Sequence, residues 1–599
     1  MIEGRVKKDR VQKLKRLFLF LVLIFFFFIP KPLFLAPAEP ARPSLVKATF
    51  FPFSLPSFSP DRQSPEVLTN LSKRKLIIIS EFPAENFEHP DIPLKKDFSS
   101  PLLSSNSSPL RLTACIEPAS SLQAQRQFNL KVQSLLNNQR FRRTTFSISI
   151  RWAGTGETIY EHRAHERMIP ASNMKLITSA AAIQLLGLDF EFKTRVALAS
   201  QSLIIIGSGD PLLGDQETDK RYGRRPDWLL EDIASRLLIK GIKSVKDIII
   251  DTSIFDDQRV HPSWPQNVLL QKYACEVSGL NYRGNCLELT VVNRQGKTFV
   301  LSEPKTSYVK FINETLATSA AENWFSVSRT SSPLVLRVTG KIRSQAGPYA
   351  VSVANPALFF GTLLKEHLMR KGIEVEGQVR EEKAPAESEL EVIAEYRTPL
   401  LDVLRRVNKD SLGLAAEALF KTLGTLDHPE GRGGSWATGR RVITRFLLDL
   451  GIPENEFFLD DGSGLSRENR LTSYALTSLL LWLYRQPCWP AFESTLAVGG
   501  VDGTLENVFR ERNLRGRVVA KTGYINGVRA LSGITHTRSG DIIFSFLANN
   551  ASNVARSIIN SIVKELTSWA DSLLGSGSSA SSPGSDSKRV NFSSSNSIN

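Results

Sequence analysis

The chain has 599 residues, and its 75 Lys and Arg exceed its 60 Asp and Glu to give a net charge of +15. Apolar residues make up 42% and charged residues 23%, a globular balance that excludes whole-chain disorder and a collagen repeat. The four cysteines are too few for a disulfide scaffold, and they form neither a CxxC pair nor a cluster with histidine, so we expect no metal site.

The N-terminal segment predicts export. Residues 1–16 hold seven Lys and Arg against two acidic residues, and the apolar run Leu17–Ile29 follows. A basic segment before a short apolar run is typical of a secretory signal, and 13 residues are too few to cross about 30 Å of hydrocarbon as a helix. Cleavage after Ala38 is one interpretation, and an uncleaved anchor with membrane association through residues 17–35 is the other. Both predict an extracytoplasmic protein, in the periplasm or cell envelope.

Two stretches have the composition of unfolded chain. Residues 39–120 are rich in Pro and Ser, and residues 575–599 contain 11 Ser in 25 positions. Such segments bury little apolar surface, so we expect a low-complexity leader between the signal (1–38) and residue 121, and a disordered Ser-rich tail. The folded part is then about 121–574.

A serine and a lysine stand three residues apart at the start of a predicted helix. Pro170 precedes the helix-forming run Met174–Leu186, so Ser172 lies near a helix N-terminus and Lys175 shares its face. A serine hydroxyl becomes a good nucleophile when a neighbour removes its proton, and a lysine does so when burial lowers its pKa. The alternative is that Ser172 is an ordinary helix cap.

The interval between the two candidate site serines, Ser172 and Ser411, is long enough to contain an inserted region. Ser172 and Ser411 are separated by about 240 residues, far more than one connection needs. We therefore expect an inserted, mainly β region at 196–385, which splits a catalytic domain into 121–195 and 386–574. The strand-like runs of this interval are Leu203–Ile206, Ile248–Ile250, Leu287–Val292 and Leu334–Val338.

Ser411-Leu412-Gly413 is the best candidate for the Ser-x-Asn pattern that would complete a serine–lysine site, although Gly413 holds the place of the asparagine. Farther on, Asp461, Ser463 and Ser466 are interpreted as structural residues of a loop near the cleft.

Lys521-Thr522-Gly523 ends a predicted strand, Arg517–Thr522. On a sheet edge this pattern offers a cation, a hydroxyl and a close approach to the backbone; a surface lysine before a turn is the alternative.

The run Asp541–Leu547 continues an antiparallel meander, and Ser552–Leu574 has the apolar spacing of a helix packed on it. Two earlier strands, Thr144–Arg151 and Thr158–Tyr160, precede the serine.

The order SxxK, SxN-like and KTG resembles the penicillin-binding protein and serine β-lactamase superfamily. More narrowly it resembles the D-alanyl-D-alanine carboxypeptidase/endopeptidase family, of penicillin-binding protein 4 type (peptidase family S13), over roughly 125–570. The resemblance implies an α+β fold, in which an antiparallel sheet has helices on both sides and carries a large inserted mainly β region. The matching segments are Pro170–Lys175, Gly207–Pro211, Glu276–Leu280, Asp461–Ser466, Gly500–Thr504 and Lys521–Tyr524.

The resemblance implies acyl transfer without a metal or cofactor. Ser172 would attack the carbonyl between the last two D-alanines of a peptidoglycan stem peptide, and Lys175 would take its proton. Ser411 would relay protons, Lys521 and Thr522 would bind the terminal carboxylate, and the oxyanion would lie between main-chain N–H groups. The predicted catalytic residues are Ser172, Lys175, Ser411 and Lys521, and the predicted substrate-binding residues are Thr522, Gly523 and Tyr524.

Three alternatives stay open. Gly413 predicts a weakened enzyme, or an inactive homologue that binds peptidoglycan; a β-lactamase or esterase is a third reading, which the insertion opposes. The partners implied are peptidoglycan stem peptides, with β-lactams as inhibitors, and the positive charge suits an anionic wall polymer better than nucleic acid. Cys275 and Cys286 are either a disulfide across a hairpin or two buried thiols.

Overall fold

The computed structural model describes residues 119–137 and 143–574. The predicted signal or anchor (1–38), the tail (575–599) and all but the last two residues of the predicted leader lie outside the described residues. Within the described ranges, no helix combines the length and the apolar character needed to cross a membrane.

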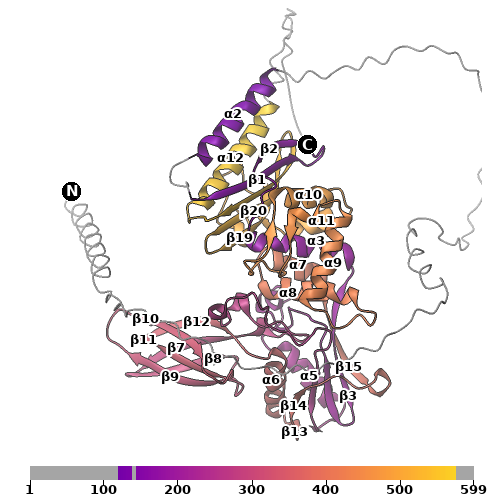
Figure 1. Cartoon of the computed structure of the whole chain (residues 1–599). Helices are drawn as coiled ribbons and strands as arrows, with labels where there is room; N and C mark the ends of the chain where they lie inside the picture. The colour runs from indigo at the N-terminus through magenta and orange to yellow at the C-terminus, as the bar shows by residue number, and fades with distance from the viewer. Residues whose placement is uncertain (1–118, 138–142, 575–599) are drawn as a thin grey trace, which may run out of the picture. The chain divides into compact units, whose positions relative to one another are not determined.

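A six-stranded antiparallel sheet forms the centre of the catalytic part, with the strand order β18-β19-β20-β21-β1-β2. Because β1 pairs with β21 along its whole length, the two ends of the folded chain share one sheet (Figure 1). This confirms the predicted antiparallel meander. The strands are β1 (Thr145–Trp152), β2 (Thr158–His162), β18 (Ala497–Val498), β19 (Val518–Ile525), β20 (Val528–Thr537) and β21 (Gly540–Asn549).

Helices cover both faces of this sheet, and β1 shows why. Its side chains alternate: Phe146, Ile148 and Ile150 belong to the apolar cluster under α2 (Ala119–Leu136) and α12 (Ala555–Leu573). The intervening Ser147 and Ser149 form hydroxyl hydrogen bonds to α10 (Ser473–Tyr484) on the other face. The predicted C-terminal packing helix is confirmed, and Figure 1 shows α2 and α12 side by side.

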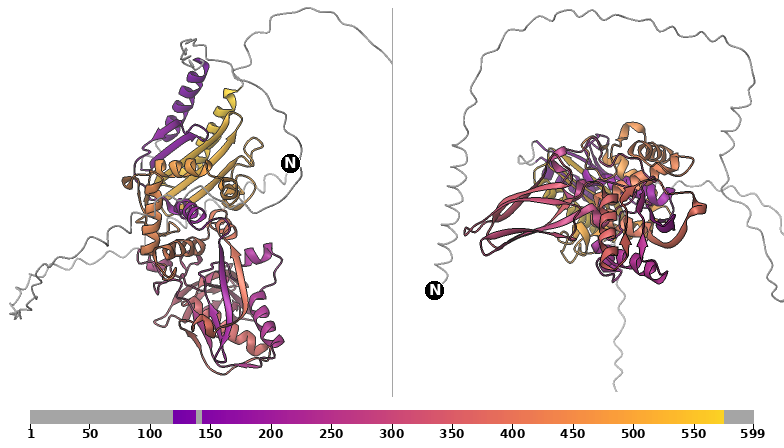
Figure 2. Two further views of the ribbon diagram at one scale, coloured as in Figure 1. Left: turned by 90° about the vertical axis from the view of Figure 1, so that its right-hand side faces the viewer. Right: turned by 90° about the horizontal axis from the view of Figure 1, so that it is seen from below.

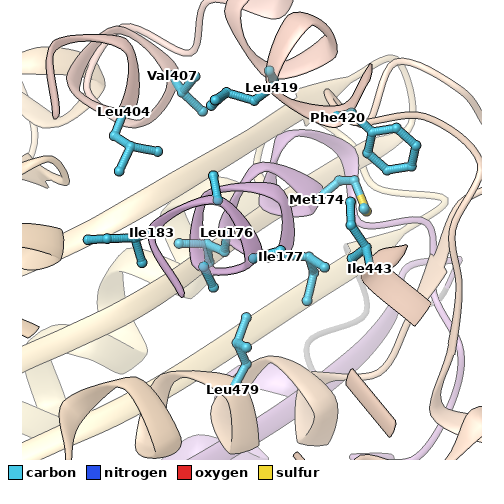
Figure 3. Close-up of a cluster of buried hydrophobic side chains, with 14 of the residues drawn as sticks. Met174, Leu176, Ile177, Ile183, Leu404, Val407, Leu419, Phe420, Ile443 and Leu479 are labelled. Atoms are coloured by element: carbon cyan, nitrogen blue, oxygen red, sulfur yellow. The ribbon is translucent and has the colours of Figure 1, made fainter. Parts of the chain in front are cut away.

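Helix α3 (Met174–Leu185) is buried on every side, and ten of its twelve side chains have almost no access to solvent. Its run of Ala180, Ala181 and Ala182 allows close approach of the neighbouring helices, while Leu176 and Ile177 fill the core (Figure 3). A helix that is buried on all sides is stable only inside a domain, so α3 is a fixed base for the residues at its start. The surrounding helices are α7 (Leu400–Asn408), α8 (Gly413–Gly424), α9 (Trp436–Asp449) and α10.

The inserted region contains a five-stranded mixed sheet with the order β14-β6-β4-β3-β15. Its centre, β4, has the sequence Ser-Leu-Ile-Ile-Ile and is buried throughout, as a strand covered on both faces requires. Helices α5 (Trp228–Ile239) and α6 (Pro356–Arg370) share an apolar cluster with it. The strands are β3 (Glu191–Ala199), β4 (Ser202–Ile206), β6 (Ile248–Asp251), β14 (Val379–Glu381) and β15 (Glu391–Pro399).

Two three-stranded sheets follow within the insertion, with the orders β12-β7-β8 and β10-β11-β9. All four strand-like runs predicted in this interval are strands, in β4, β6, β7 and β11. The bounds are β7 (Cys286–Arg294), β8 (Lys297–Glu303), β9 (Lys310–Ala317), β10 (Asn323–Arg329), β11 (Val335–Ile342) and β12 (Gln345–Ser352). The short elements of the chain are α4 (Gln216–Arg221), β5 (Ser244–Val245), β13 (Glu374–Val375), β16 (Phe457–Phe458), β17 (Arg470–Leu471) and α11 (Trp489–Ser494).

The chain enters and leaves the insertion through two neighbouring strands, since β3 pairs antiparallel with β15 from Glu191 opposite Pro399 to Leu198 opposite Glu391. An insertion that starts and ends at adjacent points leaves the host domain undisturbed. The predicted limits of 196–385 stay a prediction, and from this pairing we propose that the insertion takes in the whole of β3 and β15.

Candidate active site

Ser172 lies in a single 3-10 turn, η2 (Ala171–Asn173), directly before α3. Ala171 has a φ of +47°, a left-handed conformation that is costly for a residue with a side chain. Its carbonyl is packed against Gly464, where an added Cβ would lie 1.8 Å from the Ala171 oxygen. Close packing therefore holds the turn in a conformation that leaves Ser172 partly exposed at the surface of the core.

Lys175 lies one turn farther along and is 2% exposed. Its Nζ is 3.4 Å from Ser172 Oγ and donates to the main-chain carbonyl of Ser463 at 2.7 Å. Burial lowers the pKa of Lys175 to about 8, although the charges of Glu417 and Asp461 act in the opposite direction. The neutral amine is thus accessible near neutral pH, which suits a general base for Ser172.

The loop that carries Ser463 is held by Asp461. Its Oδ1 accepts from Gly464 N at 2.7 Å, and its Oδ2 accepts from Ser466 N at 2.6 Å and from the indole of Trp264 at 2.9 Å. A carboxylate that accepts several N–H groups fixes the main chain around it. The residues of this loop that we interpreted as structural from the sequence do hold the loop, and the carbonyl of one of them, Ser463, accepts a hydrogen bond from Lys175.

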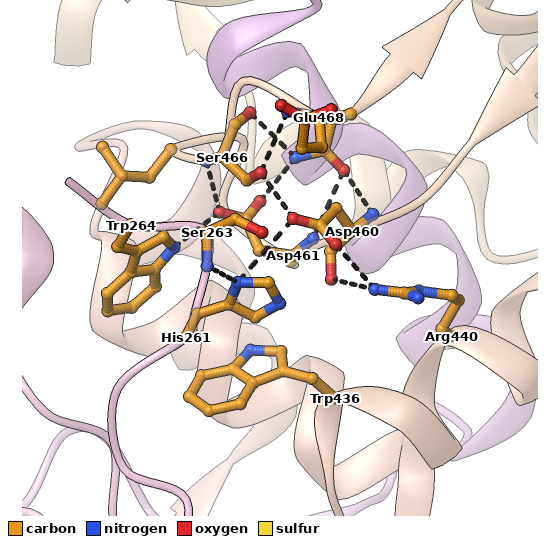
Figure 4. A network of polar contacts seen from close by, with 12 residues as sticks. His261, Ser263, Trp264, Trp436, Arg440, Asp460, Asp461, Ser466 and Glu468 are labelled. Carbon is orange, nitrogen blue, oxygen red and sulfur yellow. Dashed lines mark hydrogen bonds and ion pairs between the residues drawn. The ribbon is translucent and has the colours of Figure 1, made fainter. Parts of the chain in front are cut away.

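Two residues of the insertion, His261 and Trp264, pack against the loop that contains Asp460 and Asp461 (Figure 4). Trp264 and His261 are both 3% exposed, and the His261 ring meets Trp436 of α9 edge-on at 5.0 Å. Burial lowers the pKa of His261, which favours its neutral form. Beside them Asp460 accepts from Ser466 Oγ at 2.5 Å. The insertion therefore contributes side chains to the support of the site.

Ser411 and Lys521 form the second half of the site. Lys521 Nζ donates to Ser411 Oγ at 2.9 Å, and its side chain is fully buried. Burial, and next the charge of Lys175, hold the pKa of Lys521 well below its ordinary value, with Asp410 opposing. Ser411 has a φ of +60°, so a second strained residue stands at the cleft. The three motifs that are far apart in sequence are brought together here.

Strand β19 runs directly past the nucleophile turn. Asn173 Nδ2 donates to Lys521 O at 2.8 Å and ties the turn to the strand. A Cβ at Gly523 would lie 2.8 Å from Ala530 Cβ and 2.9 Å from Pro170 O, so only glycine fits between them. Thr522 Oγ1 donates to Thr504 Oγ1 at 2.8 Å in the Gly500–Thr504 segment, and Tyr524 is half exposed. The predicted substrate-binding residues thus follow one another along this strand beside Ser172.

Gly413, at the asparagine position, faces main chain from the insertion. A Cβ at this position would lie 2.8 Å from the carbonyl oxygen of Tyr273, in the turn η4 (Lys272–Ala274). The space next to Gly413 is therefore filled by the backbone of the insertion. Asn408 does not substitute for the missing amide, because it is buried in hydrogen bonds to Ser179 and Thr495.

Glu417 of α8 is the residue that sequence reasoning missed. It is 1% exposed, and burial, with the charge of Asp461, raises its pKa to about 7. The available signal was that Glu417 is the one ionisable residue in the otherwise apolar run 412–420.

Cys275 and Cys286 are free, buried thiols, the second of the two predicted alternatives. Burial raises the pKa of Cys286 to about 12 and that of Cys275 well above its ordinary value, so neither thiol is activated. In the described ranges, no group of His, Cys, Asp and Glu side chains is arranged to hold a metal ion.

The site combines a serine beside a buried lysine with a second lysine and serine, next to an antiparallel sheet that has helices on both sides. This combination is typical of serine acyl-transfer enzymes of the β-lactamase and transpeptidase type. The family model described as "D-Ala-D-Ala carboxypeptidase 3 (S13) family" matches residues 128–570. The chain belongs to this family, which confirms the prediction made from its motifs, and it is a serine-type carboxypeptidase.

Individual proteins that are similar to this chain support the same family assignment. The D-alanyl-D-alanine carboxypeptidase of Actinomadura sp. (strain R39) is 30% identical over 428 residues, which cover 67% of this chain and 77% of that protein. D-alanyl-D-alanine carboxypeptidase DacB of Haemophilus influenzae is 26% identical over 411 residues, 66% of this chain and 83% of that protein. The crystal structure of penicillin-binding protein 4 from H. influenzae has a TM-score of 0.62 at 22% identity and covers 74% of this chain and 98% of its own, which confirms the predicted fold class.

Proposed function

We propose that the protein hydrolyses D-Ala-D-Ala bonds of peptidoglycan stem peptides through an acyl-enzyme on Ser172. The observation that carries this proposal is the 3.4 Å approach of the buried Lys175 amine to the Ser172 hydroxyl, with Lys521 and Ser411 on the other side of the cleft. Membership of a D-Ala-D-Ala carboxypeptidase family supports the substrate class. The relatives described above give no support to the alternative of an inactive binding homologue.

In the first half-reaction Ser172 Oγ attacks the carbonyl of the penultimate D-alanine, and Lys175 takes the hydroxyl proton. The N–H groups of Ser172 and Tyr524 stabilise the oxyanion, and each such donor is worth about 3–4 kcal/mol of barrier. Collapse breaks the peptide bond, and the proton held by Lys175 passes through Ser411, which also accepts a hydrogen bond from Lys521, to the leaving amine, so that Lys175 is neutral again. Lys521 and Thr522 bind the terminal carboxylate. Water then attacks the ester, Lys175 takes a proton from the water, and that proton returns to Ser172 Oγ as the acid product leaves.

The same site can remove a terminal D-alanine or cut a D-alanyl crosslink, because both reactions pass through the same acyl-enzyme. β-Lactams are expected to acylate Ser172, since the solved penicillin-binding protein 4 of H. influenzae has also been determined with a β-lactam, at a TM-score of 0.57 to this chain. We further propose an extracytoplasmic location, supported by the basic and apolar N-terminal segment and by the polymer on which such enzymes act.

The test is mass spectrometry of muropeptides after incubation with the purified protein, with Ser172→Ala as the matched control. Loss of one D-alanine from pentapeptides identifies carboxypeptidase activity, and cleavage of crosslinked dimers identifies endopeptidase activity. The control is expected to leave both unchanged. Unaltered muropeptides with folded wild-type protein would refute the proposal and favour the non-catalytic alternative.

A further inference from the structure

The buried acid Glu417 is placed by none of the three sequence motifs, yet it lies at the centre of the main-chain support of the site. Its Oε2 accepts from Gly462 N at 2.9 Å and from the indole of Trp436 at 2.8 Å, and its Oε1 accepts from Ser463 N at 2.8 Å. Burial raises the pKa of Glu417 to about 7, and the three N–H donors support the ionised form, which prevails above that pH.

Ser463 connects this carboxylate to the catalytic lysine. Its N–H donates to Glu417 Oε1 at 2.8 Å, and its carbonyl accepts from Lys175 Nζ at 2.7 Å. Glu417 and Lys175 thus form hydrogen bonds with the N–H and the carbonyl, respectively, of the same residue, Ser463. A shift of the carboxylate displaces Ser463, and the lysine loses the acceptor that aims its amine at Ser172.

Charge couples the same residues. Glu417 and Asp461 favour the ammonium form of Lys175, whereas the like charge of Lys175 acts against protonation of Lys521. Asp461 also faces Glu417, and Lys421, one turn farther along α8, is a further charged neighbour. These groups are all buried, so water screens their interactions little.

We propose that Glu417 is a positioning residue for the general base: it orients Lys175 through Ser463 and stabilises the ammonium that forms when Lys175 takes the Ser172 proton. The proton leaves the hydroxyl, resides on Lys175 opposite the Glu417 carboxylate, and is handed on as the leaving group departs. This inference rests on the proposed function, and it names a residue that does not touch the substrate.

The test is the pH profile of the acylation rate by a chromogenic β-lactam for wild type, Glu417→Gln and Glu417→Asp. The amide in Glu417→Gln directs an NH2 group at an N–H donor, so we expect the plateau rate to fall on the order of tenfold. Loss of the negative charge removes support for the ammonium, so the midpoint is expected to move to lower pH by about one unit. Glu417→Asp keeps the charge and is expected to retain the wild-type midpoint.

A matched control is Asp210→Asn, since Asp210 is another buried carboxylate, bonded to Leu212 N and Thr398 in the insertion. It is expected to leave the midpoint unchanged. A reduced plateau with an unmoved midpoint in Glu417→Gln would show a purely structural role and overturn the proposal, as would wild-type values of both. If Glu417→Gln does not fold, a wild-type plateau in Glu417→Asp, whose shorter side chain cannot keep the same contacts, overturns it. Absence of acylation in the wild type itself would instead refute the proposed function.

Discussion

The two walls of the cleft are built on different principles. On one side Lys175 is held by the catalytic domain's own loop, through the Ser463 carbonyl and the carboxylates of Glu417 and Asp461 behind it. On the other side Ser411 is supported by Lys521, while the neighbouring Gly413 is covered by the backbone of the insertion at Tyr273. The first wall is a network of charged side chains, and the second wall depends on close main-chain packing.

The difference teaches where each wall tolerates change. We expect the first wall, around Lys175, to lose function when a charge or an acceptor of N–H groups is removed, because its members are buried and depend on one another. The second wall is sensitive to added volume at Gly413, since a side chain there would contact main-chain atoms of Tyr273, which cannot rotate away. Four experiments separate these two kinds of dependence.

The largest effect is expected for Lys175→Ala, which removes the base from the first wall. General acid–base groups contribute about 10²–10⁴-fold, so the acylation rate is expected to fall by that factor, measured with a chromogenic β-lactam. Lys365→Ala is the control, because Lys365 is a half-buried lysine of α6 in the insertion that donates to the Gly377 carbonyl. A loss below about tenfold for Lys175→Ala would show that another group removes the proton.

The pH dependence of acylation tests the same wall without a mutation. Burial lowers the pKa of Lys175 to about 8, and the base acts in its neutral form. The acylation rate is therefore expected to rise about tenfold per pH unit below this value and to level off above it. A rate that is flat between pH 6 and 9, with intact folding by circular dichroism, would contradict a lysine base.

Gly413→Asn tests the second wall. Restoring the family's asparagine would be expected to raise activity if its place were empty, but the Tyr273 carbonyl is 2.8 Å from the added Cβ. Overpacking is expected to lower the free energy of unfolding by about 1–3 kcal/mol. Displacement of the neighbouring Ser411 is expected to slow acylation on the order of tenfold to a hundredfold. Gly154→Asn is the control, since no atom lies within 4 Å of a Cβ at that turn. A higher acylation rate for Gly413→Asn would show that the main chain at Tyr273 moves aside easily, and would contradict this account of the second wall.

The smallest effect is expected for Trp264→Phe, which removes the indole donor to Asp461 and keeps an aromatic ring, although a smaller one, at this position. A lost buried hydrogen bond costs about 1–1.5 kcal/mol of unfolding free energy, measured by urea denaturation, and the acylation rate is expected to change only a few-fold. A loss of acylation as large as that of Lys175→Ala would mean that the insertion takes part in the chemistry directly.

Much of the catalytic part could be predicted from the sequence. The serine, both lysines and the glycine of the KTG strand stand in local patterns whose helix and strand context is readable, and the strands β4, β6, β7 and β11 were clear from short apolar runs. Lys175 approaches Ser172 because three residues on a helical turn bring side chains to one face, which spacing alone predicts.

The supporting contacts could not be predicted, because they join segments far apart in the chain. Nothing local shows that Glu417 will receive the N–H groups of residues 462 and 463, or that the Tyr273 carbonyl will lie against Gly413. A lone acid in an apolar helix is a weak signal that gains meaning only when its partner is known. For the same reason Gly413 suggested a simple loss from the sequence, whereas the structure shows that the neighbouring space is filled.

The most direct test of the central claim is peptide mapping by mass spectrometry after a brief reaction of the wild-type protein with benzylpenicillin. The account predicts one covalent adduct, located on Ser172, which is absent from Ser172→Ala and slowed in Lys175→Ala. An adduct on another residue, or none in protein shown to be folded, would contradict it.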